Sequence, residues 1–124
     1  MLAIPIVILL TGAVGLGVYM GLRYLRRLRN KPTIIGLHFL LGAGVLEPAL
    51  IAMRGGMGGP LKQISFASAL GVTFVGLALV TGITAVMIGR KSRQTADIAL
   101  ATHVGVAAIA FVLIMTWAIS VWRA

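Results

Sequence analysis

The sequence predicts an all-α integral membrane protein, a four-helix bundle that forms one transmembrane domain over residues 1–124. The first observation is composition: 60% of the residues are hydrophobic and 10% are charged, whereas soluble domains carry about 25% charged residues. The second is a mean hydropathy of +1.07. The third is that the 11 Lys and Arg residues lie almost entirely between four long apolar runs, each close to the about 20 residues that a helix needs to cross a bilayer.

The first two spans form a hairpin around a basic loop. The first span is expected at about residues 2–22 and contains the spacing Gly17-x-x-x-Gly21, which lets another helix approach closely in lipid. The second is expected at about residues 33–53, because Pro32 favours a helix start there. A glycine-rich loop follows.

The last two spans form a second hairpin. The third is expected at about residues 64–88 and the fourth at about residues 98–121, with Thr95 as the N-cap of the fourth. Trp117 and Trp122 near its end are typical of a membrane–water interface.

The positions of the basic residues predict the orientation. The first loop carries Arg23, Arg26, Arg27, Arg29 and Lys31, the third carries Arg90, Lys91 and Arg93, and the second carries Arg54 and Lys62. Because Lys and Arg accumulate in cytoplasmic loops, we expect both termini outside, in the bacterial inner membrane. This distribution indicates a lipid bilayer rather than nucleic acid as the partner of the positive charge. The second and fourth spans then run parallel, so the halves could form a parallel repeat of a hairpin; the residue match does not establish a duplication.

Two histidines are the main candidates for chemistry. His38 lies five residues after Thr33 and His103 six residues after Asp97, so both are expected roughly 7–9 Å below the cytoplasmic boundary. Ionisable groups in hydrocarbon are costly and usually functional. Two neutral imidazoles at one level suit the two axial positions of a haem b iron. The alternative is a structural role, in which each histidine hydrogen-bonds a Ser or Thr hydroxyl or a backbone carbonyl inside the bundle.

Two further observations agree with a haem. Small residues surround both histidines, which leaves space for a flat macrocycle. Four arginines, Arg23, Arg27, Arg90 and Arg93, border the same level and could hold the propionates, although the orientation rule alone explains their presence. Chlorophyll remains an alternative, but it needs one axial histidine and no matched pair.

In architecture the chain resembles the four-helix membrane b-type cytochromes, such as the cytochrome b561 group and the haem-bearing membrane anchors of succinate dehydrogenases. The resemblance covers the helix count and the placement of His38 and His103 on alternate helices. It implies one haem, because two haems would need four histidines. The chain contains no cysteine, so any haem is held without covalent attachment.

Glu47 is the remaining ionisable residue within a span and is followed by Pro48. It is expected about half a turn away from His38, where it could serve a proton or quinone site. The alternative is an ion pair with Arg54 two turns later, and we favour it.

The function expected from these patterns is an electron-transfer subunit that ligates one haem through His38 and His103. The sequence lacks the motifs of hydrolases and nucleotide-driven enzymes, so catalysis by this chain alone is not expected. Two alternatives stay open: a cofactor-free accessory subunit of a larger membrane complex, and a small transporter that uses Glu47. We expect other membrane subunits or a homo-oligomer as partners, with quinone as a possible reactant.

Overall fold

The computed structural model describes residues 3–53, 66–89 and 91–123, which form helices joined by turns, with no strand among them. The helices are α1 (Ala3–Leu25), α2 (Pro32–Met53), α3 (Phe66–Ile88) and α4 (Arg93–Arg123). All four are long enough and apolar enough to cross a membrane. The prediction of an all-helical, four-helix chain is therefore confirmed.

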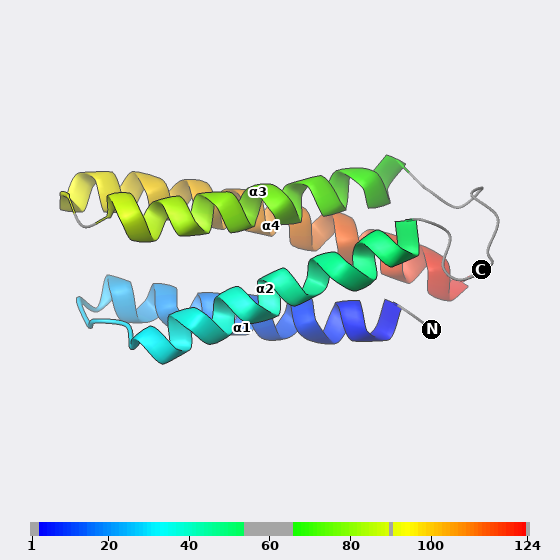
Figure 1. Cartoon of the computed structure of the whole chain (residues 1–124), viewed down its shortest axis with the longest axis horizontal. Helices are drawn as coiled ribbons and strands as arrows, with labels where there is room; N and C mark the ends of the chain where they lie inside the picture. The colour runs from blue at the N-terminus through cyan, green and yellow to red at the C-terminus, as the bar shows by residue number, and fades with distance from the viewer. Residues whose placement is uncertain (1–2, 54–65, 90, 124) are drawn as a thin grey trace.

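The four helices lie side by side as two hairpins (Figure 1). The α1–α2 turn and the α3–α4 turn lie at one end, which we call the basic end, and the first residues of α1 and the last of α4 lie at the other. Beyond the two hairpins, α2 contacts α3 and α1 contacts α4. This closed ring of contacts places α2 and α4 on a diagonal of the bundle.

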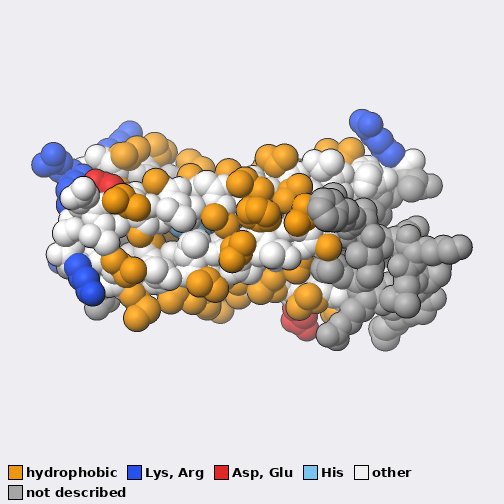
Figure 2. Space-filling model, turned by 90° about the horizontal axis from the view of Figure 1, so that it is seen from above, with side chains coloured by type: hydrophobic (Ala, Val, Ile, Leu, Met, Phe, Trp, Pro, Cys, Tyr) orange, Lys and Arg blue, Asp and Glu red, His pale blue; other side chains and the backbone are white. Residues whose placement is uncertain are grey.

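Charge separates the two ends. The space-filling view shows most of the described Lys and Arg side chains gathered at the basic end, with apolar side chains along the length of the bundle (Figure 2). Large exposed apolar residues, such as Ile8, Leu40 and Val112, occur on α1, α2 and α4. Such a surface would be costly in water and suits a lipid environment.

The turn after α1 is closed by a pair of backbone hydrogen bonds. The N–H of Arg27 donates to Tyr24 O at 2.9 Å, and that of Leu28 donates to Arg23 O at 2.9 Å. This is the Schellman pattern, in which the residue after the helix takes a left-handed conformation. Arg27 does so with φ of 59°, although glycine is the usual residue there.

The start of α4 differs from the expectation. The N–H of Thr95 donates to Ser92 Oγ at 3.1 Å, which makes Ser92 the N-cap, so the assignment of Thr95 was wrong. The helix begins at Arg93, five residues before the expected start at 98. Hydropathy marks where apolar residues begin, whereas the polar residues Arg93 to Thr95 extend the helix by a further turn.

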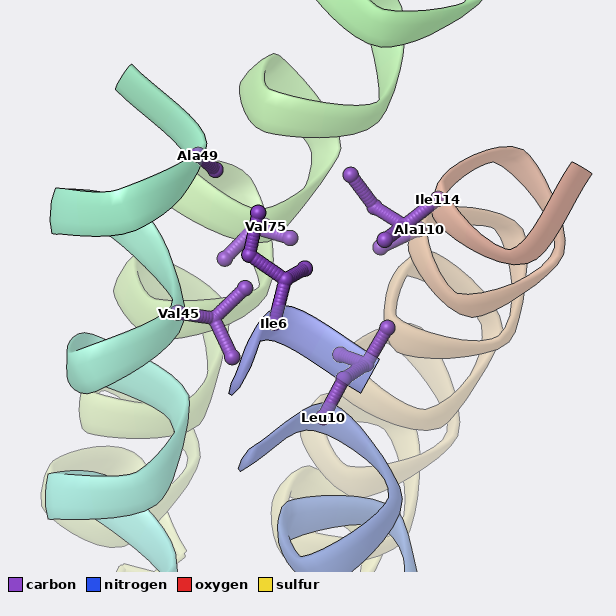
Figure 3. Packing of buried hydrophobic residues seen from close by; sticks show 7 residues of the cluster. All are labelled: Ile6, Leu10, Val45, Ala49, Val75, Ala110 and Ile114. Carbon is purple, nitrogen blue, oxygen red and sulfur yellow. The ribbon is translucent and has the colours of Figure 1, made fainter. Parts of the chain in front are cut away.

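The buried cluster lies at the end of the bundle opposite the basic end, where side chains from all four helices converge (Figure 3). Its members are Ile6, Leu10, Val45, Ala49, Val75, Ala110 and Ile114. Large and small residues alternate across it: Gly71 on α3 faces Ile114 on α4, and a Cβ added at Gly71 would lie 2.8 Å from Ile114 Cδ1.

The half of the bundle nearer the basic end is packed differently. Among the described residues, the segments 14–25, 32–44, 76–88 and 93–109 contain no fully buried side chain. Buried side chains are confined to the opposite half, from Ala13 outward on α1. The four segments are nevertheless in close contact at some positions, since a Cβ added at Gly82 would lie 3.0 Å from His103 and one at Gly42 would lie 3.3 Å from Leu79.

Candidate functional site

His38 is held within the first hairpin by the backbone of α1. Its Nδ1 lies 2.8 Å from the carbonyl oxygen of Ala13. A carbonyl oxygen can only accept a hydrogen bond, so the ring nitrogen donates and Nδ1 carries the proton. The ring lies over Gly17, where an added Cβ would be 3.1 Å from Cε1 of the imidazole.

His103 repeats this arrangement within the second hairpin. Its Nδ1 lies 2.9 Å from the carbonyl oxygen of Ala78 and 3.4 Å from Thr81 Oγ1. An added Cβ on Gly82 would be 3.0 Å from Cε1 of this imidazole. A neutral imidazole with its proton on Nδ1 carries a lone pair on Nε2.

The two imidazoles lie next to one another across the α2–α4 diagonal, edge to face. Their ring centroids are 5.9 Å apart and their planes make an angle of 82°. His103 lies ten residues into α4, whereas His38 lies six residues into α2. The rings still meet, because α4 begins further out than α2.

The two half-sites occupy equivalent positions in the two hairpins. In each, 25 residues separate the histidine from the alanine that accepts its hydrogen bond. Several other pairs of residues have the same separation in sequence as His38 and His103. They are Ala13 with Ala78, Gly17 with Gly82, Leu10 with Val75, Val45 with Ala110, and Ala49 with Ile114. Overall residue identity between the halves is low, but the positions that form the site are identical. Comparing the spacing before each histidine would have found the alanines and glycines from the sequence.

Arg23 is half-buried in the last turn of α1, at the basic end. Its guanidinium donates to Arg29 O at 2.7 Å and lies 5.8 Å from the ring centroid of Tyr19. Its Nε is buried and has no hydrogen-bond partner among the described residues. Arg23 therefore retains one unused donor in the basic half of the bundle.

The other three predicted arginines differ from Arg23. Arg27 is exposed at the tip of the turn. The guanidinium of Arg93 lies over the ring of Tyr24, 5.7 Å from its centroid. Arg90 is outside the described residues. The structure therefore describes three of the four arginines, all at the basic end.

A contact that the sequence did not indicate joins the two hairpins at the basic end. The hydroxyl of Tyr24, near the end of α1, donates to Asp97 Oδ1, on the first turns of α4, at 2.6 Å. The equivalent positions on the other side of the bundle are Gly89 and Pro32, which have no side chains able to form this bond. The equivalence of the hairpins therefore ends at this contact.

Glu47 lies on an exposed part of α2, away from the histidine pair. Its expected partner Arg54 is outside the described residues, so that ion pair stays a prediction. Pro48 is accommodated within α2, which continues to Met53.

The described residues contain no group of three or more His, Cys, Asp or Glu side chains that could hold a metal ion. No protein-family model, curated protein or solved structure matches this chain. Chemistry must therefore be inferred from the two imidazoles and their surroundings.

Proposed function

We propose that the chain is an integral membrane protein that binds one haem b between His38 and His103 and transfers electrons as a subunit of a larger system. The observation that supports this most directly is the paired geometry. Each Nδ1 donates to a backbone carbonyl of the neighbouring helix, and the two rings lie 5.9 Å apart. A histidine that ligates a metal is normally oriented by a hydrogen bond from its other ring nitrogen. Here that nitrogen is Nδ1, which leaves Nε2 for the metal.

The number of ligands favours a metal that arrives inside a macrocycle. A bare metal ion at a protein site usually takes four or more ligands, whereas this interior offers two imidazoles and no cluster of three among the described residues. A tetrapyrrole supplies four equatorial nitrogens itself and needs only axial ligands. Because the chain lacks cysteine, attachment by thioether bonds is excluded.

The spacing of the rings also fits. Two metal–imidazole bonds of about 2 Å, with each ring centre about 1 Å behind its nitrogen, place the ring centroids about 6 Å apart. The measured separation is 5.9 Å. The same separation also lies within the range of about 4.5–7 Å of ordinary edge-to-face ring pairs, so the distance is compatible with the haem and does not by itself require it.

The interior has the composition that a flat cofactor requires. Gly17 and Gly82 bring the backbones of α1 and α3 against the two imidazoles, and the basic half has no buried side chains of its own among the described residues. A macrocycle held by His38 and His103 would have two arginines at the basic end to bind its propionates: Arg23, which has an unused Nε–H, and Arg27, which is exposed.

Electron transfer is the chemistry that such a site supports. A bound haem supplies one-electron redox chemistry, and imidazoles on both faces leave no open position for oxygen or a substrate. The chain's own residues hold the imidazoles in place and exclude water. With the basic loops in the cytoplasm, the site would lie in the inner half of the membrane, and electrons would enter from that side.

The test is an optical spectrum of detergent-purified protein supplied with haem. We expect the sharp reduced-minus-oxidised bands of a six-coordinate b-type haem at one haem per chain. His38→Ala and His103→Ala should each abolish that low-spin spectrum. Thr102→Ala is the matched control, because Thr102 neighbours His103 and bonds only to Ile98 O of its own helix.

The accessory subunit without cofactor is the second candidate, and one observation favours it. The two histidine–carbonyl bonds join α1 to α2 and α3 to α4 whether or not a metal is present. If purified protein binds no haem and both histidine variants only lose stability, this function replaces the first.

A further inference from the structure

The two imidazole planes cross at 82°, and each plane is set by contacts within its own hairpin. An imidazole turns easily about its Cβ–Cγ bond, because torsions of this kind have broad minima. Here the carbonyls of Ala13 and Ala78 fix the directions of the two Nδ1 atoms. Gly17 and Gly82 closely approach the adjacent ring atom, Cε1, on the same edge of each ring.

We propose that Gly17 and Gly82 are positioning residues that keep the two axial imidazole planes crossed at the iron. This rests on the haem binding proposed above. A Cβ at Gly17 would lie 3.1 Å from Cε1 of His38, and one at Gly82 would lie 3.0 Å from Cε1 of His103. Both distances are shorter than ordinary van der Waals contact, so a methyl group at either position would make the imidazole rotate.

The equivalence of the hairpins explains why the planes cross. The two half-sites are held by the same contacts, and a two-fold rotation that related them would carry a ring inclined to its axis into a ring inclined the opposite way. Two rings tilted by nearly half a right angle are then close to perpendicular. The crossing angle would therefore follow from the same ring inclination in each of the two hairpins.

The crossing angle has an electronic consequence. Each imidazole interacts through its π orbital with the iron d orbital perpendicular to the ring plane. Parallel rings act on the same d orbital and separate it from its partner, whereas crossed rings act on both and keep them nearly equal in energy. Ferric haem with crossed axial rings therefore shows a strongly anisotropic electron paramagnetic resonance spectrum with one prominent low-field line. Parallel rings give three resolved lines.

The experiment is electron paramagnetic resonance of the ferric, haem-loaded full chain, with an optical spectrum of the same samples. The wild type should show the single low-field line. Gly17→Ala and Gly82→Ala should keep the six-coordinate optical spectrum while the low-field line moves to higher field and further lines become resolved. Gly15→Ala and Gly76→Ala are the controls on the same helices, because a Cβ at either meets nothing within 4 Å, and they should leave the spectrum unchanged.

The outcomes separate the two proposals. A six-coordinate optical spectrum with three resolved resonance lines in the wild type would refute the crossed planes and leave haem binding intact. Glycine variants with the wild-type resonance would refute the positioning role. A glycine variant that loses haem while it unfolds at the temperature of its control would also refute it, because the glycine would then be needed for ligation itself. Absence of haem from the wild type would overturn both proposals.

Discussion

Exchanging a large and a small residue between α3 and α4 tests whether the two hairpins pack equivalently. Ile6 on α1 is equivalent to Gly71 on α3, and Ala49 on α2 is equivalent to Ile114 on α4. The large residue is therefore on the first helix of the first hairpin and on the second helix of the second hairpin. The perturbation is Gly71→Ile, Ile114→Ala and the double variant, which gives the second hairpin the residues of the first. All four positions are buried.

The cost of Ile114→Ala can be worked from its burial. Ile114 is 1% exposed, and truncation removes three side-chain carbons. In water about 0.8 kcal/mol per buried carbon would be lost, but in a bilayer the unfolded reference is also apolar, so this transfer contribution largely disappears. A cavity of about 80 Å³ at about 24 cal/mol per Å³ remains and costs about 2 kcal/mol. Gly71→Ile alone should cost about 1–3 kcal/mol by overpacking, since even one Cβ would lie 2.8 Å from Ile114 Cδ1.

The double variant should recover most of both losses, with a coupling energy of about 0.5–3 kcal/mol for residues in contact. The measurement is reversible unfolding in mixed detergent micelles, with Ile109→Ala as the control. Ile109 lies on the same helix and is 46% exposed, so its truncation should change the free energy of unfolding little. Strictly additive losses in the double variant would refute the packing equivalence of the hairpins.

Four further predictions concern other parts of the molecule. Arg27→Gly should raise the free energy of unfolding by about 1 kcal/mol, because glycine adopts the left-handed conformation without the Cβ penalty; a chemical or thermal melt would show a loss if the turn were different. Glu47→Gln should leave any haem spectrum unchanged, and a lost spectrum would place this carboxylate at the site. Tyr24→Phe removes the bond to Asp97 and should speed hydrogen exchange at the start of α4, with no effect expected on α3. In α3 without haem, amides of residues 76–88 should exchange faster than those of 66–75, and haem should slow them selectively; equal rates in both states would argue against a cofactor in the basic half.

The helices could be predicted from the sequence because apolar runs and basic loops follow directly from the cost of charge in lipid. Their exact starts could not, as α4 shows. Ser92 and Arg93 to Thr95 are polar and lie beyond the apolar run, so only capping geometry reveals that they begin the helix.

The facing histidines and the small residues around them could be anticipated from the sequence, but the particular backbone carbonyls that accept their hydrogen bonds could not. The acceptors at Ala13 and Ala78 are backbone carbonyls, and a carbonyl has no residue type by which to recognise it. The bond from Tyr24 to Asp97 depends on how two helices far apart in the chain approach each other at the basic end. Such contacts depend on packing rather than on local pattern.

The equivalence of the two hairpins has a consequence for how such a chain can arise. A hairpin crosses the bilayer twice and returns the chain to the side on which it began. A gene segment encoding one hairpin can therefore be copied in tandem, and the copy inserts in the same orientation with its own basic turn, without any change to the charges that direct insertion. After such an event each half can accumulate substitutions separately. Tyr24 and Asp97, whose equivalent positions hold Gly89 and Pro32, are a place where the two halves differ.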